Sequence, residues 1–139
     1  MRQGNHDEAL REFTKALQLE PRSALAYANR SWIRRYRREY ETALADANRA
    51  VLLDPGLIGG WVSRGKVYAL TGQYEKALAD FNKAVEIDSK SSFALAALAW
   101  FQATCADGKY RDAKGALENA QEADRLMPAK NGWLLEAVA

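Results

Sequence analysis

The sequence predicts an all-α fold, a solenoid in which antiparallel helix hairpins stack side by side. A short motif recurs with a step of 34 residues, as Ala9-Leu10, Ala43-Leu44 and Ala77-Leu78. Within each recurrence the apolar residues are spaced by three and four positions, which is the spacing of one helix face. No stretch alternates between apolar and polar residues as a strand would. A fixed period of this length is the signature of a stacked repeat.

The same patterns place the helices in order. Pro21 and Pro55 each close a helix, because proline cannot continue the hydrogen-bond ladder, and Asp88-Ser89 takes that place in the third recurrence. Gly72 and Asp107-Gly108 mark turns. Short connections force consecutive helices to run antiparallel. We predict seven complete helices and a partial eighth, at about residues 5–19, 24–36, 40–53, 58–70, 74–87, 92–105, 109–126 and 131–139.

Composition excludes several classes of protein. The 139 residues are 48% apolar and 27% charged, a balance typical of a folded chain. A net charge of +2 is too small to attract nucleic acid through bulk charge. No apolar run approaches the ~18 residues of a membrane span, and the first residues lack the apolar core of a signal peptide. The sequence therefore predicts a cytoplasmic protein that does not enter a membrane.

The residues that catalysis needs are missing from the sequence. His6 is the only histidine and lies near a terminus, where chains fray, and Cys105 is the only cysteine, so zinc-ligand spacing is not met. Three clustered glycines lack the lysine and the serine or threonine of a phosphate-binding loop: Gly56, Gly59 and Gly60. Most carboxylates are expected to face solvent, as at Glu75, Asp80 and Glu86. We therefore predict no enzyme activity, no metal and no cofactor.

The recurring positions resemble the tetratricopeptide repeat, a 34-residue unit of two helices, A and B. The third unit matches most of the family pattern, at Trp61, Gly65, Tyr68, Gly72, Tyr74, Ala77, Phe81 and Ala84. The second unit supplies Tyr27, Ser31, Tyr40, Ala43, Ala50 and Pro55. That unit departs at Arg34, where the family has a large apolar residue, and at Arg38, where the turn usually has glycine. The segment at 99–113 resembles a variant unit common in bacterial members.

The resemblance implies a right-handed superhelix formed by a single array over residues 1–139. Its parts are helix B of a partial unit at 1–23, units at 24–57 and 58–91, a unit lengthened by two residues at 92–128, and the start of a further unit at 129–139. Because uncovered ends would expose apolar stacking faces, we expect the chain to be a fragment of a longer protein. Homodimerisation through the terminal helices is a second hypothesis.

In this family the concave surface is built mainly from helix A, on the face opposite the packing aromatics. Carried over by position, the peptide-binding residues of this groove are Asn29, Trp32, Arg35, Tyr36, Val62, Ser63, Lys66, Leu70 and Trp100, with Phe93, Ala97 and Thr104 on the same face. This mixture of apolar platforms and hydrogen-bond donors suits an extended peptide, so a protein-protein interaction scaffold is implied. The alternatives are that Trp32 and Trp100 pack between units, and that the chain is a structural spacer or self-associating segment of a larger protein.

Two further patterns concern the charge of the partner. Some family members hold a C-terminal carboxylate with a clamp of Lys, Asn and Arg; Asn29 falls on its asparagine, but Gly59 and Ser63 stand at the Lys and Arg positions, which argues against such a clamp. Five arginines cluster within nine residues: Arg30, Arg34, Arg35, Arg37 and Arg38. They suit an acidic peptide, or form a solvated face partly neutralised by Glu39 and Glu41. RNA is the least favoured partner, because the cluster occurs in one unit only.

Overall fold

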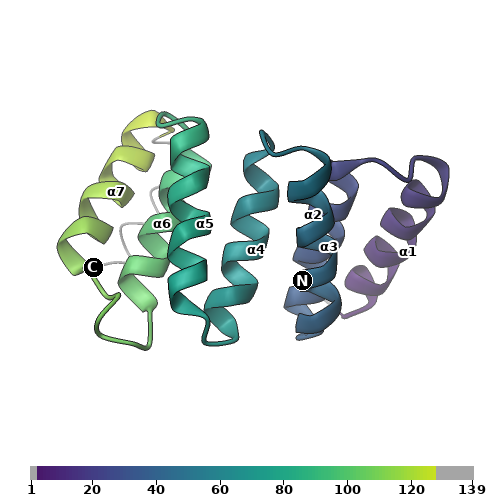
Figure 1. Cartoon of the computed structure of the whole chain (residues 1–139), viewed down its shortest axis with the longest axis horizontal. Coiled ribbons are helices and arrows are strands. Elements are labelled where there is room, and N and C mark those ends of the chain that lie inside the picture. The colour runs from purple at the N-terminus through teal and green to yellow at the C-terminus, as the bar shows by residue number, and fades with distance from the viewer. Residues whose placement is uncertain (1–2, 128–139) are drawn as a thin grey trace.

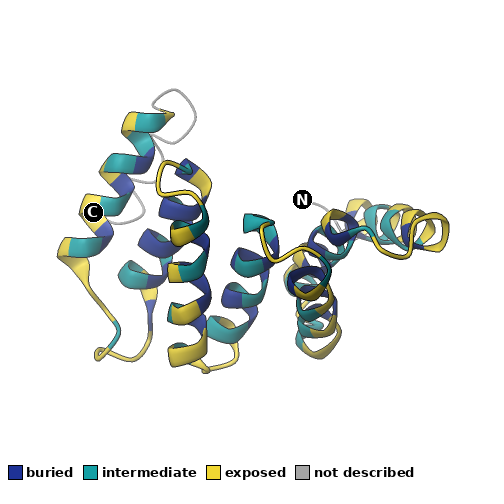
Figure 2. Cartoon of the chain, turned by 45° about the horizontal axis from the view of Figure 1, so that its top comes forward, coloured by how far each residue is buried: buried dark blue, intermediate teal, exposed yellow. Residues whose placement is uncertain are grey.

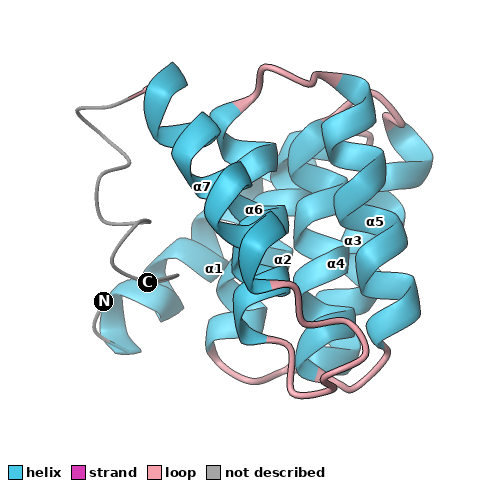
Figure 3. Ribbon diagram, turned by 90° about the vertical axis from the view of Figure 1, so that its left-hand side faces the viewer, coloured by secondary structure: helices cyan, strands magenta, loops and turns pink. Residues whose placement is uncertain are grey.

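The computed structural model describes residues 3–127, and helices are the only regular secondary structure in that range. The helices are α1 (Gln3–Leu19), α2 (Ala24–Tyr36), α3 (Tyr40–Leu53), α4 (Ile58–Leu70), α5 (Tyr74–Ile87), α6 (Ser92–Thr104) and α7 (Ala113–Leu126). The hairpins stack in a row in chain order, from α1 at one end to α7 at the other (Figure 1), and α4 contacts α2 and α6 as well as α3 and α5. Viewed along that row, the connecting loops gather at the two ends of the helices (Figure 3). The predicted all-α solenoid is therefore confirmed.

The helix ends follow from local sequence. Ser23 caps α2 and Ser91 caps α6, because each side-chain oxygen accepts a hydrogen bond from the backbone N–H three residues later, at 3.2 and 3.1 Å. The limits of α1 to α6 lie within two residues of those that the sequence predicts. The helix predicted at 131–139 and the further unit predicted at 129–139 lie outside the described residues.

The start of α7 differs from the prediction. A helix from about residue 109 was expected, but α7 begins at Ala113. Asp112 is its N-cap, and its carboxylate accepts a hydrogen bond from the Gly115 N–H at 2.9 Å. Tyr110 therefore lies in the loop before α7, although the matching Tyr74 starts α5. The two tyrosine rings still pack together, with centroids 6.0 Å apart.

The core lies between neighbouring helices, where small and large side chains alternate. Ala77 and Ala84 of α5 are fully buried, and Phe81 between them packs against Phe101 of α6 with ring centroids 5.5 Å apart. A Cβ atom at Gly65 of α4 would lie 3.0 Å from the Phe81 ring, so this close approach favours glycine. Buried residues face neighbouring helices along the row, and exposed residues lie on the loops and outer faces (Figure 2).

Two buried arginine–aspartate pairs repeat in successive units. Arg30 of α2 donates two hydrogen bonds to Asp46 of α3, at 2.9 and 2.8 Å, and Arg64 of α4 donates the same two to Asp80 of α5. Asp46 and Asp80 are only 4% and 3% exposed. The expectation that Asp80 faces solvent is therefore wrong, because a guanidinium accompanies the carboxylate into the interior. Arg64 also donates to Asn48 of α3 at 3.2 Å, which ties its hairpin to the preceding one.

The turn between α2 and α3 offers a stabilising substitution. Arg38 there has a φ of 61°, and Gly72 has a φ of 83° in the matching turn between α4 and α5. A side chain costs about 1–2 kcal/mol in this left-handed conformation, and glycine costs about 0.5–1 kcal/mol in chain entropy. We expect Arg38→Gly to raise the free energy of unfolding by about 0.5–1 kcal/mol, measured by chemical denaturation. Gly72→Ala is the reciprocal control and should lower that free energy; an unchanged or less stable Arg38→Gly variant would contradict the prediction.

Candidate functional site

The first helices of the three hairpins bring predicted groove residues together. α4 packs against both α2 and α6. On α2 the Arg35 guanidinium lies over the Tyr36 ring, 5.0 Å from its centroid. The Arg35 charge acts on Lys66 of α4, and the Lys66 ammonium lies 5.4 Å from the ring centroid of Trp100 on α6. We call Tyr36, Arg35, Lys66 and Trp100 the central row.

Two cations of the central row have no acidic partner among residues 3–127. Neither the Arg35 nor the Lys66 side chain makes a hydrogen bond or ion pair within that range, and Arg35 Nε is buried without a hydrogen-bond partner there. Burial lowers the pKa of Arg35 from its usual value. Burial, followed by the positive charge of Arg35, lowers the pKa of Lys66 to about 8. Two like charges are thus held close together with little water, an arrangement that an anion would relieve.

Three neighbouring arginines, two on α2 and one at its C-cap, are already neutralised. Arg30 and Arg34 both donate to Asp46, at 2.8 and 2.9 Å, and Arg37 donates to Glu39 at 2.8 Å. From the sequence, Glu39 and Glu41 at the start of α3 were expected to neutralise these arginines. Instead the buried Asp46, further along α3, accepts most of their hydrogen bonds. Asp46 also explains why Arg34 stands at a position where the family has a large apolar residue, because the two side chains form an ion pair. The partly buried positive charge left for a ligand is therefore that of the central row.

An aromatic platform lies at the α2 end of the central row. The Trp32 and Tyr36 rings meet edge to face with centroids 4.8 Å apart, and the two residues are 38% and 55% exposed. His6 of α1 lies 5.8 Å from the Tyr36 ring and is buried, so it is packed against α2 rather than at a frayed end. At the other end of the row Trp100 is half-buried and packs edge to face on Phe81, with centroids 6.3 Å apart.

Two predicted peptide-binding residues lie inside the protein instead, and so does Ala97, which was predicted on the same face and is 4% exposed. Val62 is 2% exposed and belongs to the core with Ala94 and Ala97 of α6. Ser63 is 7% exposed, and its hydroxyl donates to the Ala28 carbonyl of α2 at 3.4 Å. Their burial follows from the packing of α4 between α2 and α6, which covers both flanks of the helix. These two side chains are therefore not available to a ligand.

The remaining predicted residues lie elsewhere on α2, α4 and α6. Asn29 is half-buried on α2, and its side chain makes no hydrogen bond within the described range. Phe93, at the start of α6, is 55% exposed. Leu70 and Thr104 lie at the ends of α4 and α6 and line a pocket of about 260 Å³ together with Trp100. The sequence predicts Leu70, Thr104 and Trp100 on the same face but gives no sign of the pocket that these three residues line.

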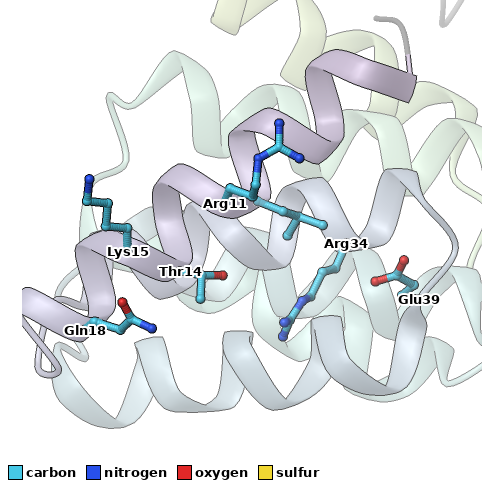
Figure 4. A pocket seen from close by; sticks show the side chains of 7 residues that line it. Arg11, Thr14, Lys15, Gln18, Arg34 and Glu39 are labelled. Atoms are coloured by element: carbon cyan, nitrogen blue, oxygen red, sulfur yellow. The ribbon is translucent and has the colours of Figure 1, made fainter.

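A larger hollow, of about 470 Å³, lies on α1 and α2 (Figure 4). It is lined by Leu10, Arg11, Thr14, Lys15, Gln18, Arg34 and Glu39. Most of these side chains are polar and lie at the outer surface of α1, and the Arg34 charge is already taken by Asp46. Size alone therefore does not identify the site, and the unpaired charges favour the central row.

Metal and membrane chemistry receive no support from the described part of the chain. Residues 3–127 contain no group of three or more His, Cys, Asp or Glu that could hold a metal ion. In the same range no helix is both long enough and apolar enough to cross a membrane. Cys105 is a free, buried thiol.

A protein made of stacked helical hairpins, in which the first helix of each hairpin lines one open face, is a helical-repeat scaffold. Family profiles described as tetratricopeptide repeat match residues 1–58 and 60–91. The chain belongs to the tetratricopeptide repeat (TPR) family, whose members are typically non-catalytic scaffolds. No curated protein sequence matches it significantly.

Solved structures with the same fold include peptide-binding proteins. TTC0263, a thermophilic TPR protein in Thermus thermophilus, has a TM-score of 0.78 at 23% identity, covering 97% of this chain and 72% of that one. YrrB, a TPR protein with an unusual peptide-binding site, has a TM-score of 0.67 at 25% identity, covering 88% and 62%. The first TPR of Spaghetti (RPAP3), bound to the HSP90 peptide SRMEEVD, has a TM-score of 0.62 at 25% identity, covering 66% and 73%. These likenesses support a protein–protein interaction scaffold.

Proposed function

We propose that this chain binds an acidic peptide or protein segment along the face of α2, α4 and α6, as a scaffold with no chemistry of its own. The observation that carries this proposal is the pair of cations Arg35 and Lys66. They are adjacent, largely withdrawn from water, and without an acidic partner among residues 3–127. A carboxylate placed between them accepts hydrogen bonds from both and replaces their repulsion by attraction.

The energetics favour a charged ligand over a neutral one. A buried cation without a partner is costly, because the interior replaces little of its lost hydration. This cost is present in the unliganded protein, where burial lowers the pKa of both Arg35 and Lys66. A carboxylate recovers it on binding, whereas an amide leaves most of it in place.

The surroundings of the cations suit an extended chain. Trp32 and Tyr36 offer exposed ring surface on one side of the pair, and the half-buried Trp100 lies on the other. Three helices contribute, so a ligand that meets all of them spans several residues. The peptide bound to the Spaghetti domain, SRMEEVD, carries three acidic residues, which is consistent with an acidic ligand on this fold.

Matched peptides test the proposal. Blocked peptides with two adjacent glutamates are compared with the same peptides carrying glutamines, by calorimetry and by the intrinsic tryptophan fluorescence of the protein. We expect the glutamate peptides to bind at least about tenfold more tightly. Equal affinity for both sets would contradict the proposal. So would tight binding of a single-stranded RNA by a protein that binds none of the acidic peptides.

The affinity for a glutamate peptide should depend on pH through Lys66. Its pKa of about 8 means that the ammonium of the free protein loses its proton as the pH rises through that value. We expect constant affinity below that pH and up to about a tenfold loss per pH unit above it. Calorimetry across this range measures the profile. Lys66→Arg should keep the affinity and remove the pH dependence, since arginine stays charged; an unchanged profile in this variant would assign the titration to another group.

The stability of the free protein should change with pH in the opposite direction. In the unfolded chain Lys66 keeps the ordinary lysine pKa of 10.5, above its value of about 8 in the folded protein. Between these two values the unfolded state binds more protons, so stability rises with pH. The two opposite slopes come from the same buried ammonium and so provide an internal check.

A spacer or self-associating segment is the alternative function. Among the described helices α1 packs only against α2, and Leu19 at its end is 78% exposed. Sedimentation over a range of concentrations separates the two functions. Binding of acidic peptides by a monomer supports the groove, whereas concentration-dependent dimers that bind no acidic peptide support self-association.

A further inference from the structure

A small pocket opens beside the central row, where α4 and α6 end and α5 begins. Its volume is about 260 Å³. The exposed Leu70 and Thr104 form its rim. The buried Phe101 and Cys105, 1% and 5% exposed, line it deeper in the core. The pocket therefore leads from the surface into the apolar interior.

Trp100 joins this pocket to the cation pair. Its side chain lines the pocket, and the Lys66 ammonium lies 5.4 Å from its ring centroid. A carboxylate held by Lys66 and Arg35 therefore lies within one or two residues of chain from the pocket, since each residue of an extended peptide spans about 3.3 Å. One ligand can reach both features at once.

We propose that this pocket receives a single aliphatic side chain of the same acidic ligand. The inference rests on the proposed function and adds a sequence requirement to it: an acidic residue followed or preceded closely by a residue such as leucine, isoleucine or methionine. The charge of the Arg35–Lys66 pair selects the acidic part of the ligand, and the apolar lining selects the other part.

The size and chemistry of the pocket define its occupant. Pockets that hold whole small ligands have volumes of about 300–1,000 Å³, so about 260 Å³ suits one side chain. The Thr104 hydroxyl at the rim already donates to the Trp100 carbonyl at 2.6 Å, so it has no proton left to offer a polar group. The side chains of Phe101, Leu70 and Ala69, which also line the pocket, contain only carbon, so the lining is mainly but not wholly apolar, with Tyr74 among its residues.

A neutral probe tests the pocket without the cation pair. N-acetyl-leucine methylamide carries the aliphatic side chain and no charge. In methyl NMR spectra of the whole chain, we expect it to shift the signals of Leu70, Thr104 and Ala69 in a saturable way, and N-acetyl-glycine methylamide to leave them unchanged. Thr104→Phe should fill the pocket and abolish the leucine-specific shifts. Thr42→Phe, at an exposed threonine of α3 that does not line the pocket, is the matched control and should keep them.

A second experiment tests whether the pocket contributes to the binding of an acidic peptide. Two glutamate peptides are compared that differ only in one residue, leucine or serine, placed one or two positions from the acidic pair. We expect the leucine peptide to bind about tenfold more tightly to the wild type, and the difference to vanish in Thr104→Phe while the preference for glutamate over glutamine remains.

The two proposals fail in different ways. Equal affinity for the leucine and serine peptides, with glutamate still preferred and no shifts from the neutral probe, would overturn the pocket and leave the acidic groove intact. Leucine-specific shifts in a protein that binds no glutamate peptide would overturn the groove and support the pocket as a separate apolar site. A leucine preference that survives in Thr104→Phe would place the apolar contact elsewhere and overturn the pocket.

Discussion

Asp80→Ala is expected to lower the free energy of unfolding by about 3 kcal/mol. The Asp80 carboxylate is buried in α5 and accepts hydrogen bonds from Arg64 Nε at 2.9 Å and Arg64 Nη2 at 2.8 Å. The guanidinium also lies over the rings of Trp61 and Tyr68, 5.0 and 5.6 Å from their centroids. Without the carboxylate, this cation stays half-buried between two rings and loses its counter-charge. Breaking a buried pair costs about 3–5 kcal/mol, and the partial exposure of Arg64 places the expected loss at the lower end.

Chemical denaturation of matched variants separates this effect from the loss of any surface carboxylate. Glu75→Ala removes an exposed carboxylate from the same helix and should change the free energy of unfolding by less than about 0.5 kcal/mol. In Arg64→Met/Asp80→Leu, apolar side chains replace both partners, so no unpaired charge remains and part of the loss should be recovered. An Asp80→Ala variant as stable as Glu75→Ala would show that the pair contributes nothing.

The arginine–aspartate pairs could have been predicted from the repeat itself. Asp46 and Asp80 stand 34 residues apart, and so do Arg30 and Arg64. A charge that recurs with the structural period is as much a part of the packing as a recurring alanine. Read one at a time, carboxylates on amphipathic helices suggest solvent exposure, and only their joint recurrence with arginine points inward. Asp80 looks exposed from the pattern of its own helix, and only the matching period of the arginines on the first helices reveals its partner.

Helix positions were predictable because they rest on local chemistry. Proline and glycine end helices by their own backbone geometry, and the spacing of apolar residues is set by the helix turn. The α7 boundary was missed because Asp112 competes with Tyr110 as the place where a helix can start, and the side chain of Asp112 accepts the hydrogen bond that a first turn needs. Because the unit at 92–128 is two residues longer than the others, the start of α7 is set by the capping preference of Asp112 and not by the repeat.

The candidate site was only partly predictable, because it depends on which charges are already paired. All five clustered arginines look alike in the sequence, yet Asp46 and Glu39 neutralise three of them, and Arg35 is left beside Lys66. The sequence places Val62 on the concave side, but packing on both flanks of α4 covers it. Both outcomes depend on neighbouring helices that approach only in the folded array.

Reversing one charge of the pair, with Arg35→Glu or Lys66→Glu, is expected to weaken the binding of a glutamate peptide by at least about 100-fold, or about 3 kcal/mol. Each reversal acts twice. It repels the carboxylates of the ligand, and it gives the remaining cation an internal partner, which removes the unpaired charge that favours binding. The free protein should therefore be at least as stable as the wild type, with unchanged helicity by circular dichroism. Calorimetry with the same peptide measures the loss.

The double reversal, Arg35→Glu/Lys66→Glu, gives the sharpest outcome. It restores two like charges in the same place with the opposite sign, so we expect a protein that rejects glutamate peptides and binds the matching lysine peptides. Arg49→Glu/Lys90→Glu, which reverses two exposed charges away from the pair and so changes the net charge equally, is the matched control and should leave the binding of both peptides nearly unchanged. A double variant that still prefers glutamate would show that the ligand does not meet this pair. A preference for lysine would place the two side chains in contact with the ligand's charge, because a change in net charge alone would be reproduced by the control.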